Sequence, residues 1–316
     1  MDPGTLSIFD RHNRKITLRE EHLLPDARCC LLCGSAELRV AGNLQRNPEV
    51  NLIECLRCRV ISAGRMPRDE ILQQYYSDYY ARDEIRITSY AEGAANHIFR
   101  RTRAFLNRDT APLRVLDFGG GDGAIAILLG RKFVRAGLAP RIEVTVVDYN
   151  ARNREVQAGI VFDWRRRLED LPASDRFDIV IASGVLEHIP QANQALAALL
   201  LRLNTAGIFY ARTPFMIAFH RICSFLRLPS PIPFPGHLHD MGRDYWDRVL
   251  AILNPGSEFR LLASNTACVE TSLLSARWPI TAIYHLLKTP SRVACLRNDY
   301  DFVGGWEVFI QRDEVA

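Results

Sequence analysis

Five of the eight cysteines fall within thirty residues of the chain. Two residues separate Cys30 from Cys33, two separate Cys55 from Cys58, and 21 residues lie between the pairs. Two such pairs can supply four thiolates to one tetrahedral ion, and a closed set of four leaves no position open for a substrate. The spacing predicts a structural zinc site. Disulfides, an iron–sulfur cluster or redox chemistry are the alternatives, and Cys29 is an alternative ligand to Cys30.

A second group of residues follows the predicted buried strand 114–118. The loop Gly119-Gly-Gly-Asp-Gly123 leads from that strand into a helical pattern, and its glycines allow a ligand to approach the backbone. The loop also satisfies the dinucleotide fingerprint, but Asp117 before it would repel a pyrophosphate and attract an ammonium or sulfonium ion. Asp148 ends the next predicted strand, where it is placed to accept from both ribose hydroxyls. Together the two carboxylates describe a ligand with an amino group and a ribose.

The elements that must position these residues alternate between strand and helix. Apolar strand and helix patterns succeed one another from residue 113 to residue 213, which predicts a parallel sheet built by right-handed crossovers. The pattern at 302–311 predicts a strand that closes the sheet as an antiparallel edge. The predicted fold is α/β, a Rossmann-like seven-stranded mostly parallel sheet with an antiparallel edge strand, plus a small N-terminal zinc ribbon.

The motifs of this region resemble those of class I S-adenosylmethionine-dependent methyltransferases. They read Val115-Leu-Asp-Phe-Gly-Gly-Gly-Asp-Gly123, then Val147-Asp148, then Phe177-Asp-Ile-Val180, then Ser183-Gly-Val-Leu-Glu-His-Ile-Pro190. Their order and spacing match the family over residues 110–215. The resemblance implies methyl transfer from S-adenosyl-L-methionine.

The cysteine pairs, followed by Tyr75 and Tyr76, also resemble a bacterial subgroup in which a zinc ribbon precedes the methyltransferase domain. Members of that subgroup are often linked to sugars, surface polysaccharides or secondary metabolites. The domains expected from this resemblance are an N-terminal arm at 1–24, a zinc ribbon at 25–66, a helical bridge or lid at 67–110, and an S-adenosylmethionine-binding methyltransferase domain at 111–316.

The family resemblance assigns roles to the residues of the cofactor site. Asp117 would face the methionyl amino group, Asp148 would hold the ribose, and Asp163 would meet the adenine amino group beside an apolar wall from Trp164. A helix cap is the alternative role for Asp148, and a solvated acid in a third loop, Phe162 to Arg165, is the alternative for Asp163. The implied cofactor contacts are Asp117, Gly119, Gly121, Asp148, Asp163 and Ser183.

Three histidines are candidates for the acceptor side of the site. His188 follows the fourth strand of the domain, at the carboxyl edge of the sheet, and a histidine there can remove a proton from an oxygen acceptor near neutral pH. His237 and His239 alternate in a loop rich in proline and glycine and would face one side if that loop is extended. They are candidates to supply the base, bind substrate or hold a metal; packing residues or a surface loop are the alternatives.

Composition limits the possible functions. The chain has 316 residues, 48% of them hydrophobic, with 40 basic and 36 acidic side chains, which is typical of a folded globular protein. No apolar run approaches the ~20 residues of a membrane span, and no secretory signal is legible, so a cytoplasmic protein is expected. The expected acceptor is a small molecule or glycan methylated at oxygen. An RNA methyltransferase that uses the ribbon to bind RNA, and a non-catalytic interaction protein, are the alternatives; nucleic acid is the less favoured partner.

Overall fold

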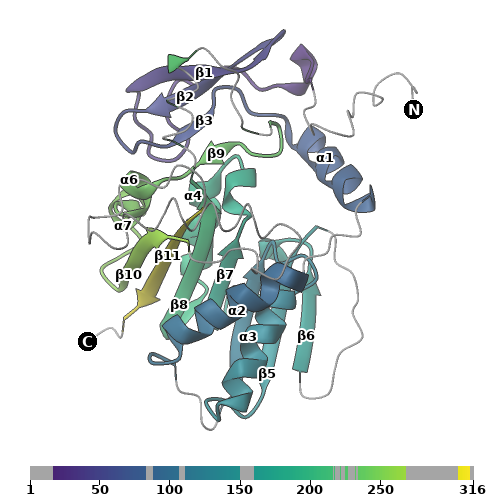
Figure 1. The fold of residues 1–316 in the computed structure, drawn as a ribbon, viewed down its shortest axis with the longest axis vertical. Helices are drawn as coiled ribbons and strands as arrows, with labels where there is room; N and C mark the ends of the chain where they lie inside the picture. Colours follow the sequence, from purple (N-terminus) through teal and green to yellow (C-terminus); the bar gives the residue numbers. More distant parts are fainter. Residues whose placement is uncertain are drawn as a thin grey trace.

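The computed structural model contains two sheets that share a hydrophobic core (Figure 1). The larger sheet has seven strands in the order β10-β11-β8-β7-β4-β5-β6, and the smaller has four in the order β1-β2-β3-β9. The structure describes residues 17–82, 88–106, 111–149, 160–215, 217, 221, 225–226, 232, 234–267 and 305–313.

The larger sheet confirms the predicted fold class. Strands β8, β7, β4, β5 and β6 are mutually parallel, whereas β11 runs antiparallel to both β8 and β10. The antiparallel strand expected at 302–311 is therefore β11, but it lies one place inside the edge, which β10 forms. The strands are β4 (Leu113–Phe118), β5 (Ile142–Val147), β6 (Ile160–Arg165), β7 (Phe177–Ser183), β8 (Leu203–Pro214), β10 (Phe259–Thr266) and β11 (Gly305–Arg312).

Alternate side chains of the parallel strands enter two separate cores. In β7, Ile179 and Ile181 pack on the side of α2 and α3, while Val180 and Ala182 face the side of α4, α6 and α7. Both faces are covered, so these strands read as continuous apolar runs in the sequence. The helices are α2 (Thr88–Thr102), α3 (Ala124–Arg135), α4 (Ala192–Leu200), α6 (Arg243–Trp246) and α7 (Val249–Leu253), with short 3-10 turns η2 (Leu168–Asp170) and η3 (Leu186–His188).

The smaller sheet is antiparallel and takes its last strand from a distant part of the chain. The hairpin of β1 (Leu38–Arg46) and β2 (Glu49–Cys55) continues into β3 (Ile61–Ala63), and β3 pairs with β9 (His239–Asp240). The segment 25–66, expected as a zinc ribbon, thus pairs with a strand from the C-terminal half of the chain. The turn η1 (Glu20–His22) precedes the sheet, and α1 (Asp69–Arg82) follows it.

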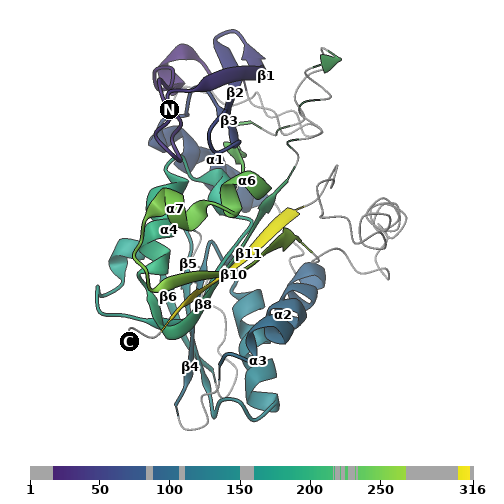
Figure 2. The same cartoon turned by 90° about the vertical axis from the view of Figure 1, so that its left-hand side faces the viewer.

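The two sheets meet at the carboxyl end of the parallel strands, where β7 and β8 finish (Figures 1 and 2). There the backbone N–H of Leu238 donates to the carbonyl of Glu187 in η3, at 2.8 Å. Since ligands of such α/β sheets bind outside the carboxyl ends of the strands, this junction is the place to look for a site. Within the described part of the chain, no helix has the length and apolar character needed to cross a bilayer.

Candidate functional site

The four cysteines of the two pairs come together at one point. The Sγ atoms of Cys30, Cys33, Cys55 and Cys58 lie within 4.8 Å of one another, with 3.6 Å between Cys30 and Cys58 and 3.5 Å between Cys33 and Cys55. Four sulfurs at these separations fit a tetrahedral ion with Zn–S bonds of about 2.3 Å. Cys29 is exposed and stands outside the cluster. The cluster therefore has the chemistry of a closed, structural zinc site.

Both cysteine pairs are closed by the same backbone turn. The N–H of Gly34 donates to the carbonyl of Cys30 at 2.8 Å, and the N–H of Arg59 donates to the carbonyl of Cys55 at 2.9 Å. Gly34 has φ of 72° and Arg59 has φ of 62°, so the residue after each pair adopts the left-handed region. Arginine takes this conformation at some cost, which the cluster and its surroundings must offset.

The glycine loop encloses an acid that has no partner for one of its oxygens. Asp117 at the end of β4 is 1% exposed, and its Oδ2 makes no hydrogen bond among the described residues. A Cβ added to Gly120 would lie 2.4 Å from Asp117 Cγ, and one added to Gly119 would lie 2.4 Å from Val185. Burial, with the nearby charges of Asp148 and Asp122, raises the pKa of Asp117 to about 7. A cationic ligand would stabilise the ionised form, so the cradle fits the ammonium of S-adenosylmethionine.

Asp148 is joined to the glycine loop. This residue, directly after β5, is buried, and its Oδ2 accepts from the backbone N–H of Gly121 at 2.9 Å. The contact fixes Asp148 at the mouth of the loop where the ribose is expected. Ser183 ends β7, which pairs with β4, the strand that carries Asp117.

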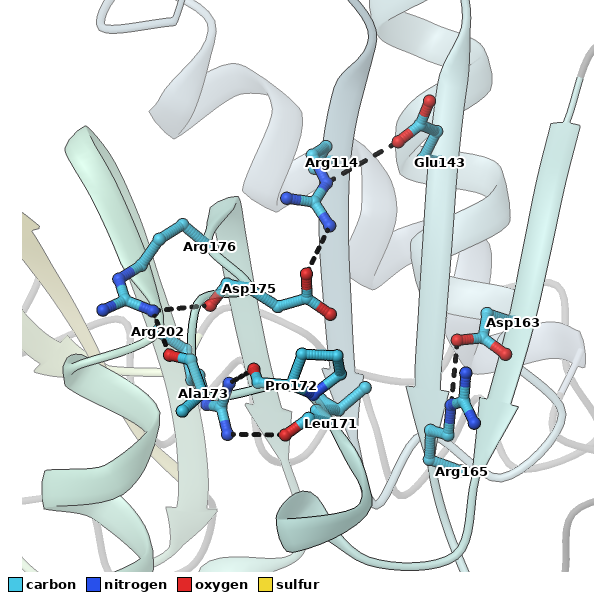
Figure 3. Close-up of polar contacts among 10 residues, drawn as sticks. All are labelled: Arg114, Glu143, Asp163, Arg165, Leu171, Pro172, Ala173, Asp175, Arg176 and Arg202. Carbon is cyan, nitrogen blue, oxygen red and sulfur yellow. Dashed lines mark hydrogen bonds and ion pairs between the residues drawn. The ribbon is translucent and has the colours of Figure 1, made fainter.

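Asp163 has a different setting from the one expected. The structure extends β6 to Arg165, so the stretch from Phe162 to Arg165 is strand rather than loop. Asp163 is 45% exposed at its side chain and pairs with Arg165 at 3.0 Å (Figure 3). Trp164, whose side chain alternates to the opposite face, packs on Phe162 with ring centroids 5.4 Å apart.

Phe162 was not singled out from the sequence, yet it touches the loop that the sequence did single out. A Cβ on Gly123, which has φ of 70°, would lie 2.8 Å from Phe162 Cζ. The Trp164 indole N–H is buried without a hydrogen-bond partner in the described residues. Phe162 and Trp164 thus form an apolar wall beside the glycine loop. The sequence signal that could have identified Phe162 is its place two residues before Trp164, on the same face of a strand.

Two of the three candidate histidines meet. His188 and His237 have ring centroids 4.7 Å apart, and their ligand atoms lie within 4.8 Å of each other and of a Glu187 carboxylate oxygen. His188 Nδ1 is 2.6 Å from the carbonyl of Gly236, which only accepts, so Nδ1 carries the proton and Nε2 holds the lone pair. Tyr76 in α1 donates to the same carbonyl at 2.7 Å. This arrangement presents a base, or a donor set for a metal.

Glu187 is the residue of this cluster that the sequence reasoning left without a role. Its side chain is almost fully buried, its Oε2 has no hydrogen-bond partner among the described residues, and its Oε1 lies 3.8 Å from His188 Nε2. Burial raises the pKa of Glu187, while the charge of His188 opposes that rise. Burial and the charge of His188 lower the pKa of His237 to about 3, which keeps that imidazole neutral.

His239 does not join the other two histidines. It is buried in β9, with Nδ1 at 2.8 Å from Ser62 Oγ and Nε2 at 3.1 Å from the carbonyls of Ile189 and Pro190. Burial lowers the pKa of His239 to about 4. All its polar atoms are engaged in holding β9 between β3 and the segment after η3. The structure thus separates His239 from His188 and His237.

The histidine cluster is linked to the glycine loop through one side chain. Val185 packs over Gly119, and the carbonyl of Val185 accepts from the N–H of His188 at 3.0 Å. The site is therefore continuous from Asp117 to His188. The chain belongs to the methyltransferase family: the model described as "Methyltransferase domain" matches residues 90–254.

Two curated relatives of the chain are described as methyltransferases. A "Ubiquinone biosynthesis O-methyltransferase" of Paramagnetospirillum magneticum is 32% identical over 115 residues, 34% of this chain and 43% of that protein. One of Cereibacter sphaeroides is 33% identical over 129 residues, 37% of this chain and 50% of that protein. The matched part thus spans half or less of the length of these relatives.

Solved structures were also matched. A plantazolicin methyltransferase, BamL, has a TM-score of 0.47 and 12% identity over 76% of this chain and 91% of its own. A Haloferax volcanii complex between the Trm112 methyltransferase activator and a methyltransferase has a TM-score of 0.48 and 14% identity. The match covers 78% of this chain and 99% of that chain.

Proposed function

We propose that the protein transfers a methyl group from S-adenosyl-L-methionine to an oxygen of a small-molecule or glycan acceptor, with His188 as the general base. The observation that carries the proposal is the orientation of His188. Its Nδ1 donates to the Gly236 carbonyl, which leaves the Nε2 lone pair to accept a proton. The names of the curated relatives favour oxygen as the accepting atom.

Asp117, Gly119, Gly121 and Asp148 would hold the cofactor, with Ser183 beside them and Trp164 as an apolar wall. Asp163 stays a candidate for the adenine amino group, although its pairing with Arg165 would have to break. When bound, S-adenosylmethionine supplies an electrophilic methyl group on a sulfonium. We place the four-cysteine zinc site, and with it a reducing, cytoplasmic setting, in the same proposal, because thiolates persist there.

The chain's own residues then account for the proton. The bound cofactor would supply the methyl group and leave as S-adenosylhomocysteine, and His188 Nε2 would accept the proton that the acceptor hydroxyl loses. The Glu187 carboxylate, 3.8 Å away, stabilises the resulting imidazolium. His237 stays neutral and packs against the His188 ring in a T-shaped contact. Alignment of donor and acceptor supplies the largest part of the rate enhancement.

The test is the formation of S-adenosylhomocysteine with a panel of phenolic and sugar acceptors. His188→Asn is expected to lower turnover by about 10²- to 10⁴-fold while the Kd of S-adenosylmethionine, measured by calorimetry, stays unchanged. His22→Asn, at a histidine of η1, is the matched control and should keep full activity. Full turnover in His188→Asn would overturn the base assignment. Turnover with RNA and with none of the small acceptors would overturn the acceptor class.

A further inference from the structure

One buried carboxylate in the smaller sheet has three arginines on it. Glu54 in β2 has no exposed side-chain surface, and it forms ion pairs with Arg39, with Arg59 at 2.7 Å and with Arg221 at 2.8 Å. Arg39 sits opposite Glu54 on β1, Arg59 follows the second cysteine pair, and Arg221 comes from the connection between β8 and β9. Arg221 thus joins three residues that lie at least 162 positions before it in the sequence. No sequence motif shows this cluster.

The cluster carries an excess of positive charge. One carboxylate balances one of the three guanidinium groups, and Arg39, Arg59 and Arg221 pair with no other acid among the described residues. Their side chains are 54%, 29% and 45% exposed. Each guanidinium carries five N–H donors, of which the contact with Glu54 uses only a part. Donors therefore remain on the solvent side of a carboxylate that fixes their positions.

The arginines lie close to the methyl-transfer site. Glu54 pairs in register with Ile61, and Ile61 pairs with Asp240, so Glu54 and Asp240 are two strands or about 10 Å apart on the same face. The charge of Asp240 acts on Glu187, next to His188. The connection that contributes Arg221 also contributes His237. One connection thus reaches both the arginine cluster and the proposed base.

We propose that Arg39, Arg59 and Arg221 form an anion subsite that binds a phosphate group carried by the acceptor. The planar guanidinium fork matches the geometry of phosphate oxygens, and three guanidinium groups held at one carboxylate have spare donors for a single tetrahedral anion. Glu54 is the positioning residue, because it holds the three side chains together. The assignment of this phosphate to the acceptor rests on the proposed function, whereas the anion subsite itself does not.

Calorimetry on the zinc-loaded full chain tests the subsite at low ionic strength, with inorganic phosphate and glucose 1-phosphate as probes. We expect saturable binding that is at least about tenfold weaker in Arg221→Gln and in Arg39→Gln, since each substitution removes a charged hydrogen-bond donor from the anion. Arg260→Gln is the matched control, because Arg260 is a similarly exposed arginine paired with Asp313 on the far edge strand. Unchanged affinity for S-adenosylmethionine in each variant shows that the fold is intact and keeps this test separate from that of the proposed function.

The outcomes divide cleanly. No phosphate binding, or binding that neither variant weakens, would overturn the subsite. Tighter binding of glucose 1-phosphate than of inorganic phosphate assigns the subsite to a phosphate of the acceptor. The reverse order assigns the subsite to a free anion and overturns its assignment to the acceptor. A short RNA that binds with a steep salt dependence, while neither phosphate binds, would make the patch a nucleic-acid surface instead.

Discussion

At the scale of single residues, the cofactor contact proposed for Asp117 would make cofactor binding depend on pH. Its pKa is raised to about 7 by burial and by neighbouring acids, and the ammonium of the cofactor favours its ionised form. Below pH 7 the bound cation must displace a proton, so we expect the affinity for S-adenosylmethionine to be about tenfold weaker at pH 6 than at pH 8. Calorimetry at the two pH values measures this. An affinity that does not change with pH would contradict the assignment.

Asp117 also makes the stability of the cofactor-free protein depend on pH, in the direction opposite to its effect on cofactor affinity. Because the folded-state pKa of Asp117 is raised, its contribution to stability is present below the unfolded pKa of 3.8 and is lost as the pH rises through about 7. Asp117→Asn should therefore raise the Tm of the cofactor-free protein, and raise it more at pH 8 than at pH 5. The variant should also bind S-adenosylmethionine weakly at both pH values. An equal change in Tm at both would count against a buried, ionised Asp117.

Spacing along the chain indicated the groups of residues that one local segment brings together. The four clustered cysteines lie in two short knuckles, and Asp117 with its glycines forms a single strand-turn-helix unit. The contact of His188 with Gly236 joins residues 48 apart, and it depends on a connection whose path no local pattern specifies. Asp163 was expected in a loop because the charged residues Asp163 and Arg165 hid the last three positions of β6.

At the scale of elements, the glycine loop makes a sharp prediction. Gly120→Ala would place a methyl group 2.4 Å from Asp117 Cγ and 2.8 Å from its Cβ, so the carboxylate has to move. We expect the affinity for S-adenosylmethionine to fall by more than about tenfold, measured by calorimetry, since the ammonium loses its aligned partner. Gly42→Ala in β1 is the control, because its nearest atoms lie at 3.9 Å and the variant should bind normally. Equal affinities in both variants would show that the cradle tolerates the methyl group.

The cysteine knuckles give a second prediction at this scale. Cys33→Ser removes one of four ligands, so the metal content should fall from about one zinc per chain to well below it, and the Tm should fall with it. Cys29→Ser is the matched control because Cys29 is exposed and outside the cluster. Elemental analysis of both variants decides. Loss of zinc from Cys29→Ser, or full zinc content in Cys33→Ser, would contradict this set of ligands.

At the scale of the whole molecule, sequence patterns predicted each sheet but not how the two sheets are joined. Strand β9 has only two residues, too few for a periodic pattern, and its partner β3 lies 177 positions away at the pair Ser62 and His239. The order of β10 and β11 is likewise set by long-range pairing, which the alternation of apolar residues does not encode. Tertiary contacts, rather than local propensity, therefore determine the pairing of β9 and the order of β10 and β11.

The contacts between the two sheets predict how the protein unfolds. The buried His239 bonds to Ser62 on one side and to the carbonyls of Ile189 and Pro190 on the other, and Arg248 donates to the carbonyl of Arg57 at 3.1 Å. One hydrophobic cluster runs from the cysteine knuckles to the larger sheet. With the core shared in this way, loss of either sheet exposes apolar surface of the other, so a single cooperative transition is favoured.

We therefore expect zinc release, followed with a chromogenic chelator, and loss of tertiary signal, followed by near-ultraviolet circular dichroism, to share one midpoint in guanidinium chloride. His239→Phe should shift both midpoints downward together, because it removes the bonds to Ser62 and to Ile189 that join the sheets. Arg260→Gln, on the far edge, should leave both nearly unchanged. Zinc release at a clearly lower denaturant concentration than the loss of tertiary signal would show that the ribbon unfolds on its own, and the shared core would then contribute little to the stability of the smaller sheet.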